Sequence, residues 1–216
     1  MPIRSTYYTF ALIVFVPALA AAQTVSDSGT FVVRHVRDTV ATEQFTRTAT
    51  KLEGTLTLRN AKSTSERWAA VVAPDATLPL IEVTVREGSD SGGRAARVVQ
   101  RARVIFKEDS AAVDAMGGQG IQTRLFATER GAVPYLNLSF ALLEQAVRRA
   151  LVSPDTSQVA FFNLGGGQTL ISKISKVGTD SLTMDIGPVQ LRLRVDPAGR
   201  VLGAWIPAQD VVVERR

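Results

Sequence analysis

The residues of this sequence that most resemble a catalytic motif are Asp90-Ser91-Gly92-Gly93, a string of the kind that surrounds a nucleophilic serine. Such a serine needs a histidine base oriented by an acid, together with an oxyanion hole. His35 is the only histidine of the chain, and it lies in an apolar segment typical of a strand. Asp, Ser and Gly are also the residues that tight turns favour. We therefore interpret this segment as a hairpin turn, and we assign no catalytic residue.

A second glycine-rich segment, Gly165-Gly166-Gly167-Gln168-Thr169, has the composition of a phosphate-binding loop. That loop requires a Lys directly before its Ser or Thr, and Gln168 occupies this place. The residues that follow, Leu170 and Ile171, are typical of a strand, whereas a phosphate loop leads into a helix. The segment is therefore expected to be the turn of a second hairpin.

Residue types that bind metals are scarce. The chain has one His and no Cys, so a zinc or copper site would have to be built from carboxylates. The Asp and Glu residues lack the Asp-x-Asp-x-Asp spacing of a calcium loop. His35 itself is interpreted as a strand residue near the surface. The sequence predicts no metal site, no cofactor and no enzymatic activity, and a hydrolase is the least favoured alternative.

The clearest periodic pattern lies near the carboxyl terminus. Apolar and polar residues alternate over 182–186 and again over 189–195, which is the period of a half-buried strand. Gly187-Pro188 changes the parity of the pattern and predicts a tight turn or a bulge. Asp196-Pro197-Ala198-Gly199-Arg200 predicts another turn, because Pro presets φ and Gly tolerates positive φ. Together with strands expected at 201–206 and 211–213, these segments predict an antiparallel meander.

The amino-terminal half has a similar, less regular pattern. Thr- and Val-rich segments are separated by polar turns and predict further strands. Residues 111–116 are expected to add a short turn of helix. The predicted strands of this half are 31–36, 40–47, 52–59, 67–72, 81–85, 94–107 and 121–128.

One amphipathic helix is predicted over 138–152. Asn137 or Ser139 is expected to be its N-cap, and Pro154 is expected to end it. The helix should either close one face of the sheet or share the hollow of a curved sheet with a ligand. Its apolar positions are Phe140, Leu143, Val147, Ala150 and Leu151, and its polar positions are Glu144, Gln145, Arg148 and Arg149.

The amino terminus predicts an export signal. Arg4 precedes an apolar run over 10–20, which is shorter than the roughly 20 residues that a membrane-spanning helix needs. Ala20-Ala21-Ala22 before Gln23 fits a signal-peptidase site. We expect residues 1–22 to be removed and 23–216 to form one β-rich domain in the periplasm or outside the cell, without stable membrane insertion.

The charge balance argues against a nucleic-acid partner. The chain has 25 Lys and Arg residues against 20 Asp and Glu residues, and the basic ones are scattered through predicted strands. Binding to nucleic acid depends on clustered basic side chains, which neutralise phosphates. Aromatic residues that could stack on bases are also few.

The order of these elements resembles that of the lipoprotein-localisation-factor superfamily. The helix over 137–151 and the meander from Ser181 to Arg215 carry the likeness best, and 29–85 fits in outline. The likeness lies in strand order and turn placement, and it is closest to uncharacterised exported domains of this build. It implies a half-open antiparallel barrel with helices over the hollow, a layout in which several members of the superfamily carry acyl chains.

The sequence therefore predicts a mainly β protein, a curved antiparallel sheet or open half-barrel with one amphipathic covering helix. Its expected function is non-catalytic binding of a lipid or another hydrophobic, acyl-bearing ligand in the hollow of the sheet. The alternative is a structural or interaction domain that binds an envelope protein and no small ligand. The residues expected to line the ligand site are Phe140, Leu143, Val147, Leu191, Leu193 and Trp205.

Overall fold

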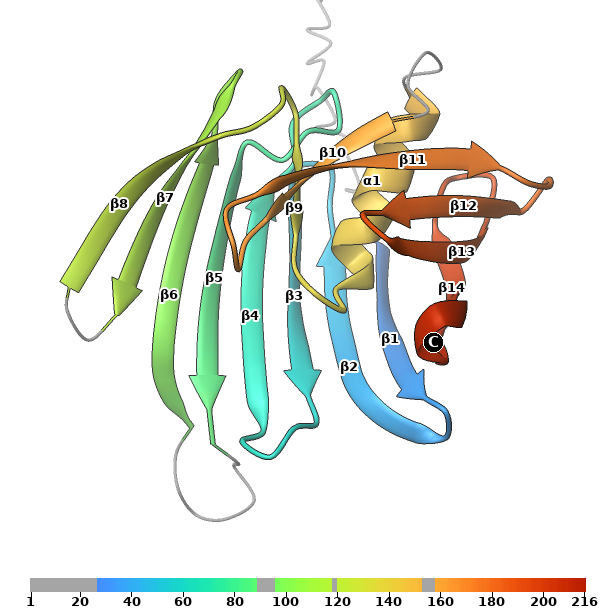
Figure 1. Ribbon diagram of the computed structural model, residues 1–216, viewed down its shortest axis with the longest axis horizontal. Coiled ribbons are helices and arrows are strands. Elements are labelled where there is room, and N and C mark those ends of the chain that lie inside the picture. The colour runs from blue at the N-terminus through green and yellow to red at the C-terminus, as the bar shows by residue number, and fades with distance from the viewer. Residues whose placement is uncertain (1–26, 89–95, 118–119, 153–157) are drawn as a thin grey trace, which may run out of the picture.

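In the described parts of the chain, fifteen strands form one continuous sheet, and a single α-helix lies against it (Figure 1). This computed structural model describes residues 27–88, 96–117, 120–152 and 158–216. The predicted mainly β fold with one helix is confirmed, and the sheet is open, because its two end strands do not pair. The predicted signal peptide over 1–22 and the Asp90-to-Gly93 turn lie outside the described residues.

The first eight strands form an up-and-down meander in which each strand pairs antiparallel with the next. They are β1 (Asp27–His35), β2 (Asp38–Arg47), β3 (Lys51–Leu58), β4 (Thr64–Val71), β5 (Leu80–Glu87), β6 (Arg97–Phe106), β7 (Ser110–Gly117) and β8 (Gly120–Ala127).

The second part of the chain contains the helix and another meander. Its elements are β9 (Val133–Tyr135), α1 (Phe140–Val152), β10 (Gln158–Asn163), β11 (Thr169–Lys176), β12 (Ser181–Ile186), β13 (Val189–Val195), β14 (Val201–Ile206), a 3-10 helix (Pro207–Gln209) and β15 (Val211–Arg215).

The two meanders are joined where the last strand returns to the first. β15 pairs antiparallel with β1, for example Val213 with Val33, so the sheet runs without a break from β8 to β9. β9 is the exception to the antiparallel order, since it pairs parallel with β10. Parallel strands require a long crossover connection, and α1 is that connection.

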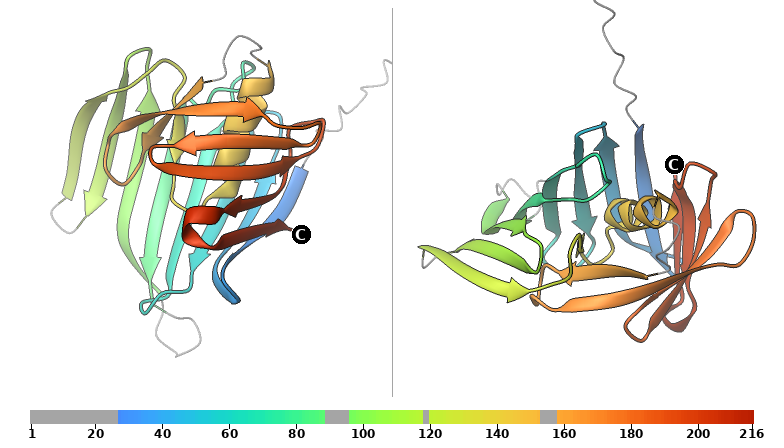
Figure 2. Two further views of the ribbon diagram at one scale, coloured as in Figure 1. Left: turned by 45° about the vertical axis from the view of Figure 1, so that its right-hand side comes forward. Right: turned by 90° about the horizontal axis from the view of Figure 1, so that it is seen from above.

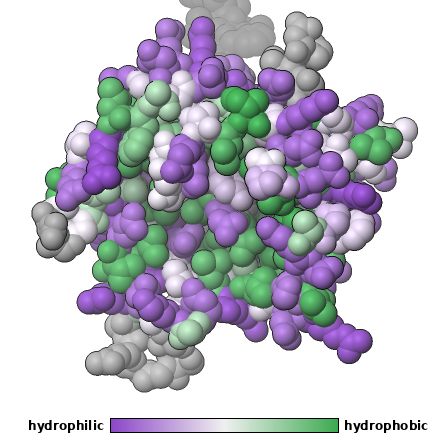
Figure 3. All heavy atoms as spheres, viewed as in Figure 1, coloured by the Kyte–Doolittle hydropathy of each residue, from purple (hydrophilic) through white to green (hydrophobic). Residues whose placement is uncertain are grey.

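The sheet curves around α1, which lies in its hollow between the strands of the two meanders (Figure 2). The helix residues that face the sheet are fully buried, and Phe140 contacts Phe31 of β1 with ring centroids 5.9 Å apart. In the view of Figure 1, hydrophobic side chains are visible among hydrophilic ones in the middle of the molecule, and the rim is mostly hydrophilic (Figure 3). The core is thus the space between the helix and the inner face of the sheet.

The predicted turns of the carboxyl-terminal meander are confirmed. Gly187 has a φ of 57° between β12 and β13, and Gly199 has a φ of 76° before β14. The Asp196 carboxylate accepts hydrogen bonds from the backbone N–H groups of Ala198 and Arg200, which closes the second turn. The glycine-rich segment over 165–169 also lies between two antiparallel strands, β10 and β11, as expected.

Two local predictions are wrong. Residues 111–116 belong to strand β7, because pairing with β6 and β8 on both sides outweighs the helix propensity of three alanines. The helix begins at Phe140 rather than at 138, since Leu138 has a φ of 65° and therefore cannot continue a right-handed helix. Among the described residues, no helix is both long and apolar enough to cross a bilayer.

Candidate functional site

Five of the six residues predicted to bind a ligand lie in the hollow. Phe140, Leu143 and Val147 of α1 and Leu191 and Leu193 of β13 are all buried in the core. The cavity beside Phe140, Leu143 and Leu191 has a volume of only about 70 Å³. Pockets for small molecules usually have at least about 300 Å³. These side chains therefore fill the hollow in this structure.

Trp205, the sixth predicted residue, lies on the opposite face of the sheet. It pairs with Arg192 across β13 and β14, and its side chain is 43% exposed. The neighbouring Ala204 pairs with Leu193 and faces the core. The prediction that Trp205 points into the hollow is therefore wrong, because strand β14 carries apolar residues on both faces.

A buried carboxylate holds the start of the helix. Glu43 of β2 accepts hydrogen bonds from the backbone N–H groups of Phe140, at 2.7 Å, and Ala141, at 2.9 Å. The Ser139 hydroxyl donates to the other carboxylate oxygen at 2.5 Å. Ser139 precedes the first helical residue, as predicted, but the acceptor for the free helix N–H groups comes from the sheet.

Burial has a large effect on this carboxyl group. It raises the pKa of Glu43 from its usual 4.5 to about 7, while the hydrogen bonds from Ser139, Ala141 and Phe140 act in the opposite direction. A group that titrates near neutral pH deserves consideration as a catalytic acid or base. Glu43 is fully buried, however, and all three hydrogen bonds hold the helix. Its geometry is that of a structural cap.

The polar side of α1 faces a second buried cluster. Glu144 is fully buried and accepts hydrogen bonds from Arg215 of β15, at 2.8 Å, and from the backbone N–H of Val201, at 2.9 Å. Arg148 and Arg215 both pair with Asp27 at the start of β1. The cluster ties the helix to the junction of the two meanders.

Arg47 of β2, the cross-strand neighbour of Asp27, completes this cluster. Its guanidinium donates to Gln145 and lies 3.7 Å from the carboxylate of Glu144. Burial, and secondarily the charge of Arg148, lowers the pKa of Arg47 to about 10, so the side chain stays cationic at neutral pH. The carboxylates of the cluster bond to Arg148, Arg215 and the backbone of Val201, which indicates a structural role.

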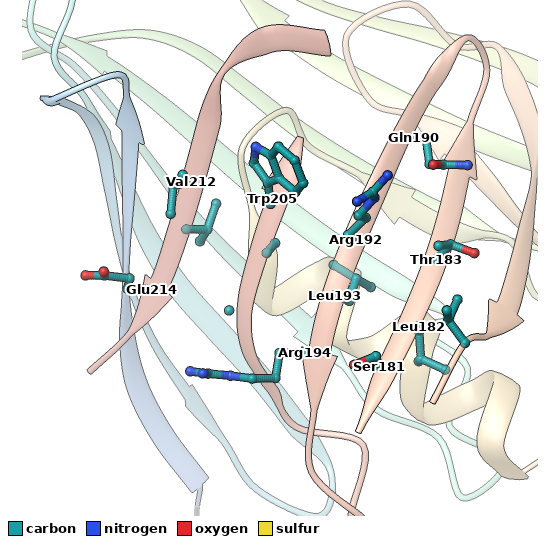
Figure 4. A pocket seen from close by; sticks show the side chains of 14 residues that line it. Ser181, Leu182, Thr183, Gln190, Arg192, Leu193, Arg194, Trp205, Val212 and Glu214 are labelled. Atoms are coloured by element: carbon teal, nitrogen blue, oxygen red, sulfur yellow. The ribbon is translucent and has the colours of Figure 1, made fainter. Parts of the chain in front are cut away.

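A groove of about 720 Å³ lies on the outer face of β12–β15, the face turned away from α1. We call it the outer groove. Its central row of cross-strand neighbours is Thr183, Arg192, Trp205 and Val212. Figure 4 shows Trp205 between Val212 and Arg192, and the Arg192 guanidinium lies 4.9 Å from the centroid of the indole ring.

The second row of the outer groove contains a gap. It runs through Ser181, Arg194, Gly203 and Glu214. A Cβ atom at Gly203 would lie 3.0 Å from the backbone oxygen of Val213 and 4.0 Å from the Arg194 guanidinium. Because Gly203 has no side chain, Arg194 extends across β14 toward β15 (Figure 4).

The outer groove has an excess of positive charge. Glu214 is its carboxylate, and it pairs with Arg34 at 2.8 Å. Within the described parts of the chain, neither Arg192 nor Arg194 forms an ion pair. Two guanidinium groups beside an exposed indole ring are suited to binding an anion that carries an apolar group.

Metal binding finds no support in the part of the chain that the structure describes. No cluster of three or more His, Cys, Asp or Glu side chains there could hold an ion. His35 lies at the end of β1 and pairs with Asp38 of β2 across the hairpin, as expected for a strand residue near the surface.

Glu43 and Arg47 were not predicted as buried residues, although their positions in β2 indicate it. Ala41 and Phe45 occupy alternate positions of β2 and face the core. The same period of two places Glu43 and Arg47 on this apolar face. Charged residues at core positions require buried partners, and α1 supplies them.

Comparison with solved structures supports the fold. The chain is similar to a DUF1089 family protein from Pseudomonas aeruginosa, with a TM-score of 0.52 and 11% identity over 95% of this chain and 98% of that chain. It is also similar to a β-barrel-like protein of the domain of unknown function DUF1849 from Brucella abortus. For that structure the TM-score is 0.51 and the identity 8%, over 88% of this chain and 94% of the other.

Comparison by sequence gives no relative. No protein-family model matches the chain, and neither does any curated protein. The structural likeness supports the expected β half-barrel fold of an uncharacterised domain, and the predicted resemblance to the lipoprotein-localisation-factor superfamily is not confirmed. At identities this low, a shared fold does not carry a shared function.

Proposed function

We propose that this chain is a non-catalytic interaction domain whose outer groove binds an extended acidic segment of a partner protein. The observation that carries the proposal is the placement of Arg192 and Arg194 beside the exposed ring of Trp205, where neither guanidinium forms an ion pair with another described residue. In this binding mode, carboxylates of the partner pair with the two arginines, and an apolar side chain packs on the indole.

The shape of the groove fits an extended chain. It is shallow and crosses four neighbouring strands, and side chains of both of its rows project from the sheet. Arginine forms bidentate bonds with carboxylates, and Trp and Arg are the residue types that contribute most to protein interfaces. Trp205 and Arg192 lie adjacent at the centre of the groove, where such contacts have the greatest effect.

Carriage of an acyl chain in the hollow has less support. The hollow contains α1, and the cavity beside the predicted residues has only about 70 Å³. Burying large apolar side chains stabilises a protein by about 1.5–3 kcal/mol each. An acyl chain could enter only by displacing the helix, which Glu43 and Glu144 fix to the sheet. The domain thus fits the interaction hypothesis better than the carrier hypothesis.

Location in the cell envelope is a further part of the proposal. It rests on the sequence of residues 1–22, which has the features of a cleaved export signal. The partner would accordingly be an exported or envelope protein with an acidic, partly apolar segment.

The proposal is tested by fluorescence anisotropy with a labelled synthetic peptide of alternating Glu and Leu. We expect the wild-type protein to bind it, with affinity that falls as salt is added. Arg192→Gln combined with Arg194→Gln should weaken binding by at least about tenfold, equivalent to about 1.4 kcal/mol. Trp205→Ala should weaken binding as well.

The matched control is Arg86→Gln, which removes one exposed charge from strand β5, outside the outer groove. It should leave the affinity unchanged. If Arg86→Gln lowers the affinity as much as the groove variants do, the peptide is attracted nonspecifically to a basic protein, which would contradict the proposal. Binding of an anionic polysaccharide in place of the peptide would also contradict it, because the occupant would then belong to another class.

A further inference from the structure

We propose that two copies of this chain associate through antiparallel pairing of strand β8 with β8 of the second copy, centred on Thr123. The proposal concerns the free edge of the first meander and is independent of the outer groove. It rests on the exposure of β8, the direction of its backbone groups, and the complementarity of its side chains with themselves.

No strand of the described residues pairs with the outer edge of β8. β8 is the end strand of the sheet, and most of its residues are exposed, with Ile121 at 65% and Leu125 at 68%. Proteins usually protect such edges with Pro, Lys or very short strands. β8 has eight residues and contains neither Pro nor Lys. The opposite edge, β9, has only three residues and includes Pro134.

The hydrogen bonds to β7 determine which backbone groups of β8 are free. The N–H of Thr128 donates to the carbonyl of Asp109 at 2.9 Å, directly after the β8 ladder. Antiparallel residues alternate between bonding to one neighbour and to the other. Even-numbered residues of β8 therefore bond to β7, and Ile121, Thr123 and Leu125 present their N–H and C=O groups at the edge.

One end of this edge is already occupied. The carbonyl of Ala127 accepts a hydrogen bond from the Thr169 hydroxyl at 3.3 Å, and the Phe126 ring packs on Phe162 and closely approaches Gly167. The part that remains free for pairing is therefore 121–125.

One symmetric register pairs all three free residues among themselves, with Thr123 opposite Thr123 of the second copy and Ile121 opposite Leu125. A register centred on Gln122 would join only Ile121 and Thr123 and would leave Leu125 out. In a register centred on Arg124, Arg124 would be opposite Arg124, and like charges directly across a sheet are destabilising. That register would also need the carbonyl of Ala127, which Thr169 engages. The first register is thus favoured, and it places Gln122 opposite Arg124.

The outer face adds an apolar contribution to this register. Met116 of β7 pairs with Ile121, and both side chains are exposed on the outer face. In the pair of copies, Leu125 of each chain would lie opposite Ile121 of the other, which shields apolar surface on both. Cross-strand pairs of this kind contribute roughly 0.2–1 kcal/mol each.

The absence of cysteine from the chain permits a direct test. In the proposed register, a Thr123→Cys variant brings two Cys residues to about 5.5 Å between Cα atoms, within the range that a disulfide spans. Mild oxidation of the naturally processed protein should yield a disulfide-linked dimer. Thr57→Cys, at an exposed position inside the sheet, is the matched control and should remain largely monomeric.

Light scattering across a range of concentrations tests the association without a crosslink. The wild type should approach twice the monomer mass, and Thr123→Pro should remain a monomer because it removes an edge N–H group. Thr123→Val retains that group and should still associate. Circular dichroism would show that each variant remains folded.

Several outcomes would overturn the proposal. One is a wild-type protein that stays monomeric at the highest concentration tested. Another is a dimer that Thr123→Pro does not weaken, which would place the interface elsewhere. Equal crosslinking of the Thr57→Cys and Thr123→Cys variants would likewise indicate random collision rather than strand pairing.

Discussion

The carboxylate of Glu43 caps helix α1 by accepting the backbone N–H of Phe140 at 2.7 Å, although the two residues lie 97 positions apart in the sequence. The free N–H groups at the start of a helix need acceptors, and a nearby side chain usually supplies one. Here the acceptor comes from the central part of the sheet. The bond therefore fixes where the crossover helix lies in the hollow.

This arrangement predicts that stability decreases as the pH rises from about 4.5 to 7. Burial raises the pKa of Glu43 to about 7, so in this interval the carboxyl is protonated in the folded chain and ionised in the unfolded one. The folded state then binds more protons, and raising the pH favours unfolding by up to about 3 kcal/mol. Thermal unfolding followed by circular dichroism at several pH values measures the effect.

Glu43→Gln is the corresponding variant, because an amide does not titrate. It retains one oxygen that can accept hydrogen bonds from the helix N–H groups. The decrease in stability between pH 4.5 and 7 should largely disappear in this variant. If stability decreases with pH as steeply in this variant as in the wild type, the pH dependence comes from other groups.

The ion cluster beside the middle of the helix predicts a large effect for Glu144→Ala. Glu144 is fully buried and bonds to Arg215 and to the backbone of Val201. Its removal leaves buried cationic groups without their partner, which typically costs about 3–5 kcal/mol. Urea unfolding should show a correspondingly lower midpoint.

Glu82→Ala provides the control for this prediction. Glu82 pairs with Arg103 at 3.8 Å on the outer face, and both side chains are largely exposed. Such pairs contribute about 0–1 kcal/mol. If the two variants lose similar amounts of stability, the buried cluster does not hold the helix in the way described.

The close packing around Gly54, in the middle of the sheet, leaves no room for a side chain. A Cβ atom at this position would lie 2.6 Å from Cζ2 of Trp68 and 2.8 Å from the carbonyl oxygen of Gln44. Gly54→Ala should therefore shift the buried indole and cost about 1–3 kcal/mol. Gly117→Ala, where no atom lies within 4 Å, should change the free energy of unfolding by less than about 0.5 kcal/mol. Urea unfolding measures both values. An equal change in the free energy of unfolding of the two variants would show that the Trp68 side chain moves aside at little cost.

Much of the fold could be predicted from the sequence, because regular alternation and turn residues are local signals. The strands at 182–186 and 189–195 bury one face, so their apolar residues recur at every second position. By contrast, 111–116 has the composition of a helix and forms a strand through pairing with β6 and β8. Pairing between segments that are distant in sequence cannot be predicted from the local residue pattern of either segment.

The candidate site could be predicted only in part. The burial of Phe140 and Leu191 follows from their positions on periodic apolar faces. The orientation of Trp205 does not, because β14 carries apolar residues on both faces, and Trp205 lies on the outer face beside the polar Arg192. Assigning its face requires the register with β13, which shifts at Arg194 and Val195.

The filled hollow leads to a last prediction, that the protein carries no lipid. Native mass spectrometry of protein purified gently from its own cells should give the mass of the chain alone or of its dimer, because only about 70 Å³ is free beside Phe140, Leu143 and Leu191. A lipid-mimicking fluorescent probe should likewise show no displaceable binding. Copurified fatty acid or phospholipid would contradict this, provided that it is lost from a folded Leu143→Arg variant. The helix would then have to leave the hollow when a ligand enters, and the bonds from Glu43 to Phe140 and Ala141 would be the contacts that break.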